Sequence, residues 1–203
     1  MTAGARTDFD PEELGHGRFY ALMTASIVPR PIAWVSTTSE DGVDNLAPHS
    51  FFPVACVAPP IVQFTSVGRK DSLRNIEATG EFVVSLTPEP LFEQVNATGT
   101  NYPADVSEFD AVGLEREPSA LVRPPRVRAS PVALECRLHS VVGLGNSWIV
   151  LGRVVHAAVH TEALADDGLP DVERLAPLSR LGRAEWGTRG EIRRIDRVPY
   201  EAD

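Results

Sequence analysis

The sequence contains only two cysteines in 203 residues, Cys56 and Cys136, and they do not form a CxxC pair. A disulfide-stabilised fold needs more cysteines, and a zinc site needs closely spaced ligands. Both cysteines lie in apolar segments, PVACVAP and VALECRL, which is typical of buried free thiols. We therefore expect two buried thiols, with neither a disulfide nor a cysteine-ligated metal.

Positive charge is scarce as well. The 19 Lys and Arg residues are outnumbered by 28 Asp and Glu residues, and the net charge is -9. A general nucleic-acid-binding protein neutralises phosphates with a surplus of basic residues, and an acidic membrane surface attracts the same surplus. The charge balance therefore predicts that the protein binds neither nucleic acid nor a membrane.

Long hydrophobic runs are absent from the sequence. The initial segment MTAGARTDFDPEELGHG lacks the apolar centre of a signal peptide. No later stretch approaches the roughly 20 apolar residues that cross a bilayer. We expect a cytoplasmic protein.

Several catalytic and nucleotide-binding motifs are missing. The sequence has no GxxxxGK[ST] loop and no GxSxG motif, and GLGNSW lacks the third glycine of a dinucleotide-binding fingerprint. His156 and His160 are spaced as two metal ligands, but no third ligand stands at a recognisable spacing. Ser50 follows His49 directly, and adjacent strand residues point to opposite faces. The sequence therefore predicts no metal site and assigns no catalytic residue.

What the sequence does contain is the pattern of one globular domain, with 43% hydrophobic and 23% charged residues. Residues 1–18 are polar and acidic and are expected to form an N-terminal arm or helix. The apolar pattern begins near Phe19, so residues 19–203 are expected to form one domain around a single core.

Most of this domain predicts antiparallel β-structure. Residues 32–37 and 43–52 flank the turn sequence SEDG, which indicates a hairpin, and further strands are expected at 59–66, 81–86, 132–142 and 148–160. In residues 132–139 the even-numbered positions are expected to face one side of the strand and the odd-numbered positions the opposite side. Gly152 offers a bend or bulge in a long strand. Consecutive hairpins favour a mainly antiparallel barrel.

Short helices interrupt these strands. Asp71 or Ser72 is expected to cap a helix that runs through Glu77 and ends at Gly80, and a second helix is expected after Pro88 or Pro90. Residues 99–131 are rich in turn-forming residues and are expected to run over the surface.

The segment GRKDSLRNI, residues 68–76, places two cations at the start of the first of these helices. Free N–H groups at a helix start bind phosphate well, and Arg69, Lys70, Ser72 and Ser66 could add charge or hydroxyl groups. The alternative is a solvated, capped helix start. The segment NLAPHSFF, residues 45–52, offers backbone polar groups and apolar cover to a flat ring, and its alternative is a proline-interrupted edge strand.

Taken together, VPRPIAWVSTTSEDGVDNLAPHSFF, APPIVQF, KDSLRNIEATGEFVVSL, EFDAVGL, PPRV and LEC occur in an order that resembles the flavin reductase-like family. The resemblance implies a mainly β, antiparallel Greek-key split barrel of the FMN-binding type. It also implies a homodimer with the flavin near the subunit interface, and NAD(P)H as the electron donor.

The resemblance also implies site residues. The isoalloxazine ring and ribityl chain of FMN would lie along Asn45, Leu46, Ala47, Pro48, His49, Ser50 and Phe51, and the phosphate would lie at Ser66, Arg69, Lys70, Asp71 and Ser72. Reductases of two-component monooxygenases often carry a histidine where this sequence has Asn146, Ser147 and Trp148. The substrate side would involve Trp148, Arg180, Gly182 and Trp186.

The resemblance implies an FMN-binding oxidoreductase that uses NAD(P)H to reduce flavin or another small acceptor. The missing histidine keeps open a non-catalytic FMN-binding or electron-carrier protein. An FMN-dependent enzyme for a specialised organic substrate is the third hypothesis, with residues 99–131 closing over that substrate.

Overall fold

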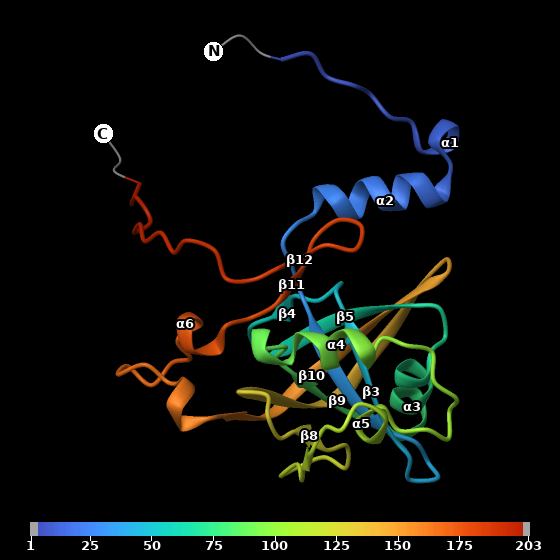
Figure 1. Ribbon diagram of the computed structural model, residues 1–203, viewed down its shortest axis with the longest axis vertical. Helices are drawn as coiled ribbons and strands as arrows, with labels where there is room; N and C mark the ends of the chain where they lie inside the picture. Colours follow the sequence, from blue (N-terminus) through green and yellow to red (C-terminus); the bar gives the residue numbers. More distant parts are fainter. Residues whose placement is uncertain (1–3, 201–203) are drawn as a thin grey trace.

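The computed structural model describes residues 4–200 (Figure 1). Its helices, with η marking a 3-10 helix, are α1 (Pro11–Leu14), α2 (His16–Ser26), α3 (Asp71–Thr79), η1 (Glu89–Leu91), α4 (Phe92–Ala97), α5 (Glu108–Ala111), η2 (Thr161–Ala163) and α6 (Val172–Leu175). Its strands are β1 (Arg30–Pro31), β2 (Ala33–Thr38), β3 (Asp44–His49), β4 (Val54–Cys56), β5 (Ile61–Val67), β6 (Glu81–Ser85), β7 (Arg116–Glu117), β8 (Arg126–Val127), β9 (Val132–Leu144), β10 (Ser147–Val159), β11 (Ser179–Arg180) and β12 (Trp186–Gly187).

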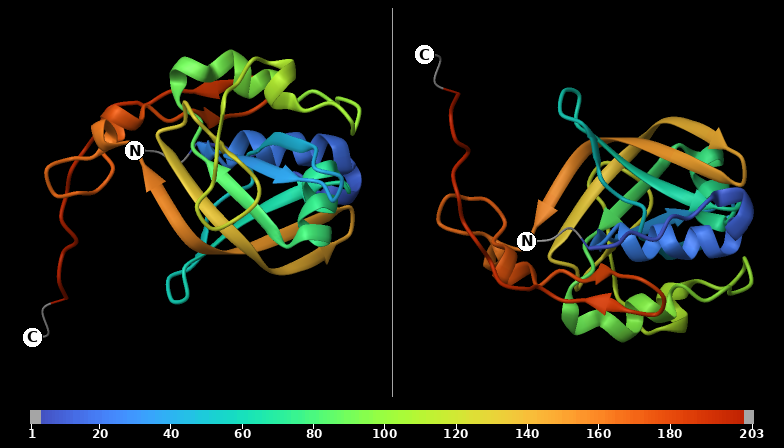
Figure 2. Two further views of the ribbon diagram at one scale, coloured as in Figure 1. Left: turned by 90° about the horizontal axis from the view of Figure 1, so that it is seen from below. Right: turned by 90° about the horizontal axis from the view of Figure 1, so that it is seen from above.

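Seven of these strands form one antiparallel sheet in the order β3-β2-β6-β9-β10-β5-β4. Directly after β3 the chain runs beside β5, where the carbonyls of Phe51 and Pro53 accept hydrogen bonds from the N–H groups of Thr65 and Gln63, both at 3.0 Å. These bonds join the two ends of the sheet, which curls round the core in both views of Figure 2. The predicted fold class, a mainly β, antiparallel Greek-key split barrel, is confirmed.

The inside of the barrel is filled by apolar side chains from β2, β5, β6, β9 and β10, together with Leu73 and Ile76 of α3. Phe64 and Phe82 meet edge to face at 5.8 Å between ring centroids. The predicted irregularity at Gly152 is present, because the β9–β10 register shifts between Leu151 and Gly152. A Cβ atom at Gly152 would collide with the Phe82 ring, so the close approach of these strands requires glycine.

The two cysteines are free thiols. Cys136 is buried in the barrel core, where burial first and Glu135 second raise its pKa to about 12. Cys56 on β4 is only partly buried, because the β4 hairpin protrudes from the sheet, and the expectation of two buried thiols is therefore wrong for Cys56.

The N-terminal region differs from the expectation that the core begins near Phe19. Helix α2 crosses the expected boundary after residue 18, and its only buried residue is Thr24. The core begins later, at Ile32 beside β1. The apolar pattern of residues 19–28 instead forms a helix across the outside of the barrel, with Tyr20, Met23 and Ile27 exposed (Figure 1).

Strand β9 has buried residues on both of its faces. Ala133 and Glu135, on the face opposite to Cys136, are buried because residues 118–127 pack over them. The Glu135 carboxylate accepts hydrogen bonds from the N–H groups of Ala120 and Leu121 at 2.8 and 2.6 Å, and it pairs with Arg126 at 2.5 Å. Burial by itself would raise the pKa of Glu135, but these bonds outweigh it and lower that pKa. Segment 118–127 is therefore fastened to the barrel.

Candidate functional site

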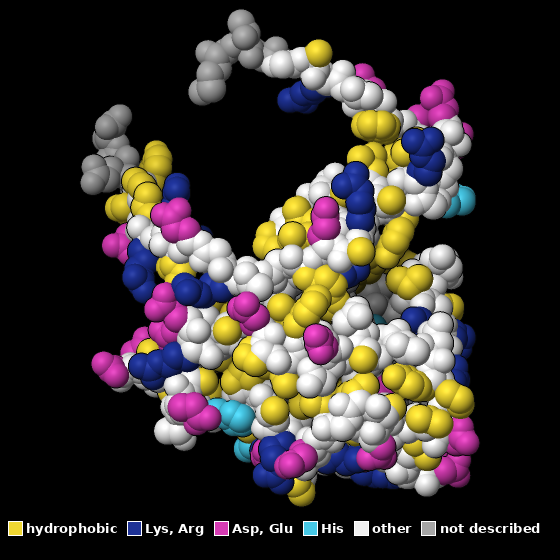
Figure 3. Space-filling model, in the orientation of Figure 1, with side chains coloured by type: hydrophobic (Ala, Val, Ile, Leu, Met, Phe, Trp, Pro, Cys, Tyr) yellow, Lys and Arg dark blue, Asp and Glu magenta, His cyan; other side chains and the backbone are white. Residues whose placement is uncertain are grey.

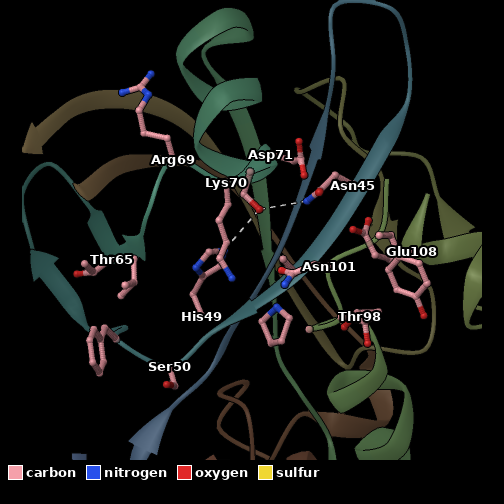
Figure 4. Close-up of a pocket in the computed structure, with 18 of the residues that line it drawn as sticks. Asn45, His49, Ser50, Thr65, Arg69, Lys70, Asp71, Thr98, Asn101 and Glu108 are labelled. Carbon is pink, nitrogen blue, oxygen red and sulfur yellow. Dashed lines mark hydrogen bonds between the residues drawn. The ribbon is translucent and has the colours of Figure 1, made fainter. Parts of the chain in front are cut away.

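A cavity of about 410 Å³ opens beside the outermost strand of the barrel (Figure 4). It lies between β3, the end of β5, the start of α3, residues 98–102 and Tyr20 of α2. This volume is within the range of roughly 300–1,000 Å³ that is usual for small-molecule and cofactor sites. All the predicted cofactor residues except Leu46 and Ser66 line this cavity: Asn45, Ala47, Pro48, His49, Ser50, Phe51, Arg69, Lys70, Asp71 and Ser72.

Leu46 and Ser66 point elsewhere because neighbouring residues of a strand face opposite sides. The Leu46 side chain is fully buried in a second core cluster with Trp34 and Phe109. The Ser66 hydroxyl is buried and donates to the carbonyl of Gly68 at 2.8 Å, so it stabilises the turn before α3. Thr65 and Val67 line the cavity on either side of Ser66 in the sequence.

The N-cap of helix α3 was expected at Asp71 or Ser72, but it lies at least one residue earlier in the chain. Lys70 occupies the N-cap position, and no side chain hydrogen-bonds to the first turn. Asp71 pairs with Arg74 instead, and the Ser72 hydroxyl accepts from the Asn45 side chain. The N–H groups of the first turn are therefore available to an anion, with the positive end of the helix dipole behind them.

The three cations around this helix start have different partners. Arg69 pairs with Glu77 and stacks on Trp148, with 5.6 Å between the guanidinium carbon and the ring centroid. Figure 4 shows its side chain directed away from Asn45. Arg74 pairs with Asp71. Within residues 4–200 no carboxylate pairs with Lys70, which is also the only lysine in the sequence. Lys70 therefore supplies the uncompensated positive charge of the cavity.

Asn45, Ser72 and His49 form a buried polar contact between β3 and α3. The Asn45 amide donates to the Ser72 hydroxyl oxygen at 3.1 Å, and the His49 Nε2 lies 3.5 Å from the same oxygen (Figure 4). The His49 ring also packs on Phe64 at 4.5 Å between centroids. This contact fixes the strand segment NLAPHSFF relative to the start of α3.

His49 is a neutral imidazole at neutral pH. Burial, and then the charge of Lys70, lower the pKa of His49 to about 4, although a hydrogen bond with the Thr65 backbone acts in the opposite direction. A neutral ring can accept a hydrogen bond at its unprotonated nitrogen, whereas an imidazolium beside Lys70 would add a second positive charge. The surroundings of His49 therefore favour its uncharged imidazole form.

The low pKa of His49 predicts an acid-sensitive stability. The folded pKa of about 4 lies below the unfolded value of 6.5, so the unfolded chain binds the proton first and stability falls as the pH drops from 6.5 towards 4. Between pH 7 and pH 5 the parent should lose about 2 kcal/mol more unfolding free energy than His49→Gln. Urea unfolding at both pH values measures this difference, and identical pH slopes would contradict it.

Glu108 is a cavity residue that the sequence analysis missed. It is buried on α5, and its Oε2 accepts the Leu46 N–H of β3 at 2.8 Å. Burial raises the pKa of Glu108, the charge of Asp71 adds to this rise, and hydrogen bonds from the Leu46 and Glu108 N–H groups oppose it. Other lining residues that were missed are Tyr20, Thr65, Val67, Arg74, Thr98, Gly99, Thr100, Asn101 and Tyr102.

The predicted substrate-side residues separate into two places. Arg180 and Trp186, on β11 and β12, line a second cavity of about 200 Å³ that shares Pro48, Ser50 and Gly99 with the first. Gly182 packs against Ala25 of α2, where an added Cβ atom would lie 3.0 Å from the Ala25 Cα. Trp148 lies at the opposite end, beside Arg69, and lines neither cavity.

None of the helices described here has both the length and the apolar character to span a bilayer. Among residues 4–200, no three His, Cys, Asp or Glu side chains gather in a way that could hold a metal ion.

The chain folds as an antiparallel split barrel with a cavity between its outermost strand, β3, and the uncapped start of α3. The model of the flavin reductase like domain matches residues 24–175. The chain therefore belongs to the flavin reductase-like family of flavoprotein oxidoreductases, as its sequence motifs indicated.

Individual relatives span nearly the whole chain. An uncharacterised protein of Halalkalibacterium halodurans is 38% identical over 200 residues, which cover 93% of this chain and 95% of that protein. Nitrilotriacetate monooxygenase component B from Bacillus cereus has a similar structure, with a TM-score of 0.89, 30% identity and coverage of 95% of this chain and 100% of that chain. The 2-nitrobenzoate 2-nitroreductase of Pseudomonas fluorescens is also similar, with a TM-score of 0.88, 29% identity and coverage of 95% and 96%.

Proposed function

We propose that the protein binds FMN and acts as an oxidoreductase that takes electrons from NAD(P)H and reduces flavin or another small acceptor. The observation that carries this proposal is the composition of the larger cavity. One end combines Lys70 with the uncapped start of α3, and the other combines strand β3 with aromatic side chains. A ligand with a phosphate and a flat, mixed-polarity ring fits both ends.

The phosphate of FMN would lie against the Lys70 ammonium, the first N–H groups of α3 and the Ser72 hydroxyl. Within residues 4–200 no carboxylate pairs with Lys70, which carries its charge on a flexible stem, and helix starts are common phosphate sites. FAD carries a second phosphate and an adenosine, for which the lining offers no comparable second cation, because Arg69 and Arg74 are engaged by Glu77 and Asp71. These pairings favour FMN.

The ring of FMN would lie beside Asn45, Ala47, Pro48 and the residues that follow them. Asn45 offers an amide whose orientation is fixed by Ser72, and Phe51 meets Tyr20 edge to face at 6.4 Å. A bound flavin supplies the hydride and electron chemistry. The chain itself orients that ring, holds the phosphate and keeps His49 uncharged beside Lys70.

The same proposal includes a homodimer with the flavin near the subunit interface. Tyr20, Met23, Ile27 and Val28 on and after α2 are exposed, although they are apolar or aromatic. Figure 3 shows hydrophobic side chains on and below α2, where this face is hollowed. Since Tyr20 also lines the larger cavity, a second copy covering α2 would lie close to the flavin.

The dimer proposal predicts the behaviour of the double variant Met23→Glu with Ile27→Glu. Two charges on the exposed face of α2 should shift the protein from dimer to monomer, because burying unpaired carboxylates opposes association. Sedimentation velocity measures the mass. The matched control is His16→Glu with Arg18→Glu, at exposed polar positions of the same helix. A parent protein that is monomeric at micromolar concentration would refute the dimer.

The test of the enzymatic proposal is a visible absorption spectrum after FMN loading and desalting, followed by anaerobic addition of NADH and then NADPH. Retained flavin that bleaches with one donor and regains its colour with an added acceptor supports the oxidoreductase. Retained flavin that stays yellow with both donors supports the alternative of a non-catalytic FMN carrier. Loss of all flavin on desalting, together with no affinity for FMN in a titration, would refute flavin binding.

The hypothesis of an enzyme for a specialised organic substrate is favoured by one observation. The second cavity adjoins the larger one through Pro48, Ser50 and Gly99, so a compound in it would lie next to the proposed ring position. The segment expected to cover the substrate was 99–131, but its part 118–127 is bound to β9 through Glu135 and lines neither cavity. On this side the cavities are lined by Asn96 and residues 98–102 instead.

A further inference from the structure

The second cavity has the size and lining of a site for one ring. Its apolar walls are Ile32, Pro48 and Trp186, and its polar groups are Ser50, Asn96 and Arg180. Its volume is about 200 Å³, and an engineered apolar cavity of about 150 Å³ is enough to bind benzene. A dinucleotide is much larger than this space.

The aromatic wall of the second cavity is held in place from two sides. The Arg180 guanidinium stacks on Trp186 with 4.5 Å between its central carbon and the ring centroid. Phe92 meets the same indole edge to face at 5.2 Å. These two contacts hold the Trp186 indole in one orientation, so the cavity has a rigid aromatic wall, which favours planar ligands.

Arg180 has no carboxylate partner among the described residues. Its guanidinium donates only to backbone carbonyls, those of Glu185 at 3.5 Å and Arg183 at 3.0 Å. A guanidinium has five N–H donors, so further donors are available to a ligand. The positive charge of this cavity is uncompensated within residues 4–200.

A second arginine stands directly opposite the first. In the β1–β11 pair Arg30 lies across from Arg180, and like charges in this arrangement are destabilising. Arg30 is only 8% exposed, donates to the carbonyls of Thr24, Ile27 and Leu181, and has no partner for its Nε–H in the described part of the chain. Burial and then the charge of Arg180 lower the pKa of Arg30. Arg30 does not line the second cavity, but an anion bound to Arg180 there would offset part of the repulsion between the two arginines.

We propose that the second cavity is the acceptor subsite and that it selects small planar organic anions, in particular a single aromatic ring carrying a carboxylate. The ring lies against Trp186 and Pro48, and the carboxylate accepts hydrogen bonds from Arg180. The position of this subsite next to a flavin rests on the proposed function, whereas the binding of the anion does not.

The test is a calorimetric titration with benzoate and with its neutral analogue benzamide, on protein with and without FMN. Benzoate should bind at least about tenfold more tightly than benzamide, because a hydrogen bond to a charged group contributes at least this factor. The preference should vanish in Arg180→Gln and recover in part in Arg180→Lys. It should persist in Arg183→Gln, which removes the same charge from the same turn at a side chain that is 85% exposed and outside the cavity.

Equal affinity of the parent for benzoate and benzamide would overturn the proposal, as would equal losses in Arg180→Gln and Arg183→Gln. The proposal would also be overturned if ADP-ribose displaced benzoate and had a higher affinity than benzoate. That result would assign Arg180 to the phosphate of a dinucleotide. Melting temperatures verify that the variants fold. Benzoate binding that persists in flavin-free protein, together with no affinity for FMN in a titration, would sustain the anion site while refuting the proposed function.

Discussion

Replacing Lys70 and Ser72 together by alanine should weaken FMN binding about 100-fold, because two hydrogen bonds to a charged phosphate contribute about 3 kcal/mol or more. Riboflavin lacks the phosphate, so its affinity should fall far less. Fluorescence titration with both ligands measures the two changes. The prediction follows from a cavity whose unpaired cation and free helix N–H groups lie at the same end.

The single variants separate two effects within this prediction. Ser72 also holds Asn45 and contacts His49, so Ser72→Ala can disturb the ring position, whereas Lys70→Ala removes only charge. Lys70→Ala alone should weaken FMN about tenfold. Arg153→Ala is the matched control, since Arg153 is an exposed cation of β10 outside the cavity. Equal weakening of FMN and riboflavin by Lys70→Ala would contradict the phosphate assignment.

The single lysine gives an independent measurement of the same contact. Acylation of Lys70 can be followed by mass spectrometry without interference from other lysine side chains. FMN should protect Lys70 from acylation more than riboflavin does at equal site occupancy. Equal protection by both ligands would place the ammonium away from the phosphate.

The second large effect is expected at Glu135. Replacement by alanine should lower the free energy of unfolding by about 3–5 kcal/mol, because two N–H groups of segment 118–127 lose their acceptor and the largely buried Arg126 keeps only the partly exposed Glu117 as its partner. Urea unfolding followed by circular dichroism measures the loss.

The matched control for Glu135 is Glu117→Ala. Glu117 pairs with the same Arg126 at 2.9 Å, but about a third of its side chain is exposed. Its replacement should cost at most about 1 kcal/mol, as is usual for solvent-exposed ion pairs. Equal losses in the two variants would show that the burial of the Glu135 carboxylate does not determine the stability.

The sequence predicts the barrel strands well because each alternates or is bounded by turn residues. The strands expected at 32–37, 59–66 and 81–86 correspond to β2, β5 and β6. The prediction that the core begins near Phe19 fails, because apolar periodicity in residues 19–28 shows that a face is hydrophobic but does not show which chain or element covers that face. The sequence also does not predict the burial of Glu135, because a charged residue in an alternating strand gives no sign of the segment that covers it.

The candidate site was predictable where its residues adjoin in sequence. Segments 45–51 and 69–72 contain most of the predicted lining. The predicted side-chain cap was wrong because Asp71 pairs with Arg74 on the next turn of α3 and Ser72 contacts Asn45 of β3, and local sequence does not reveal this second partner across the fold. Glu108 was missed for the same reason: its acceptor role depends on Leu46, far away along the chain.

The contact between Glu108 and Leu46 also bears on how the protein avoids self-association through its sheet. Backbone N–H and C=O groups alternate in direction along a strand, so on β3 those of Asp44, Leu46 and Pro48 point away from β2. The Leu46 donor is occupied by Glu108, and Pro48 has no N–H group at all. Since an unprotected outer strand recruits further strands into amyloid-like aggregates, this donor-poor border favours a protein that remains dispersed at high concentration.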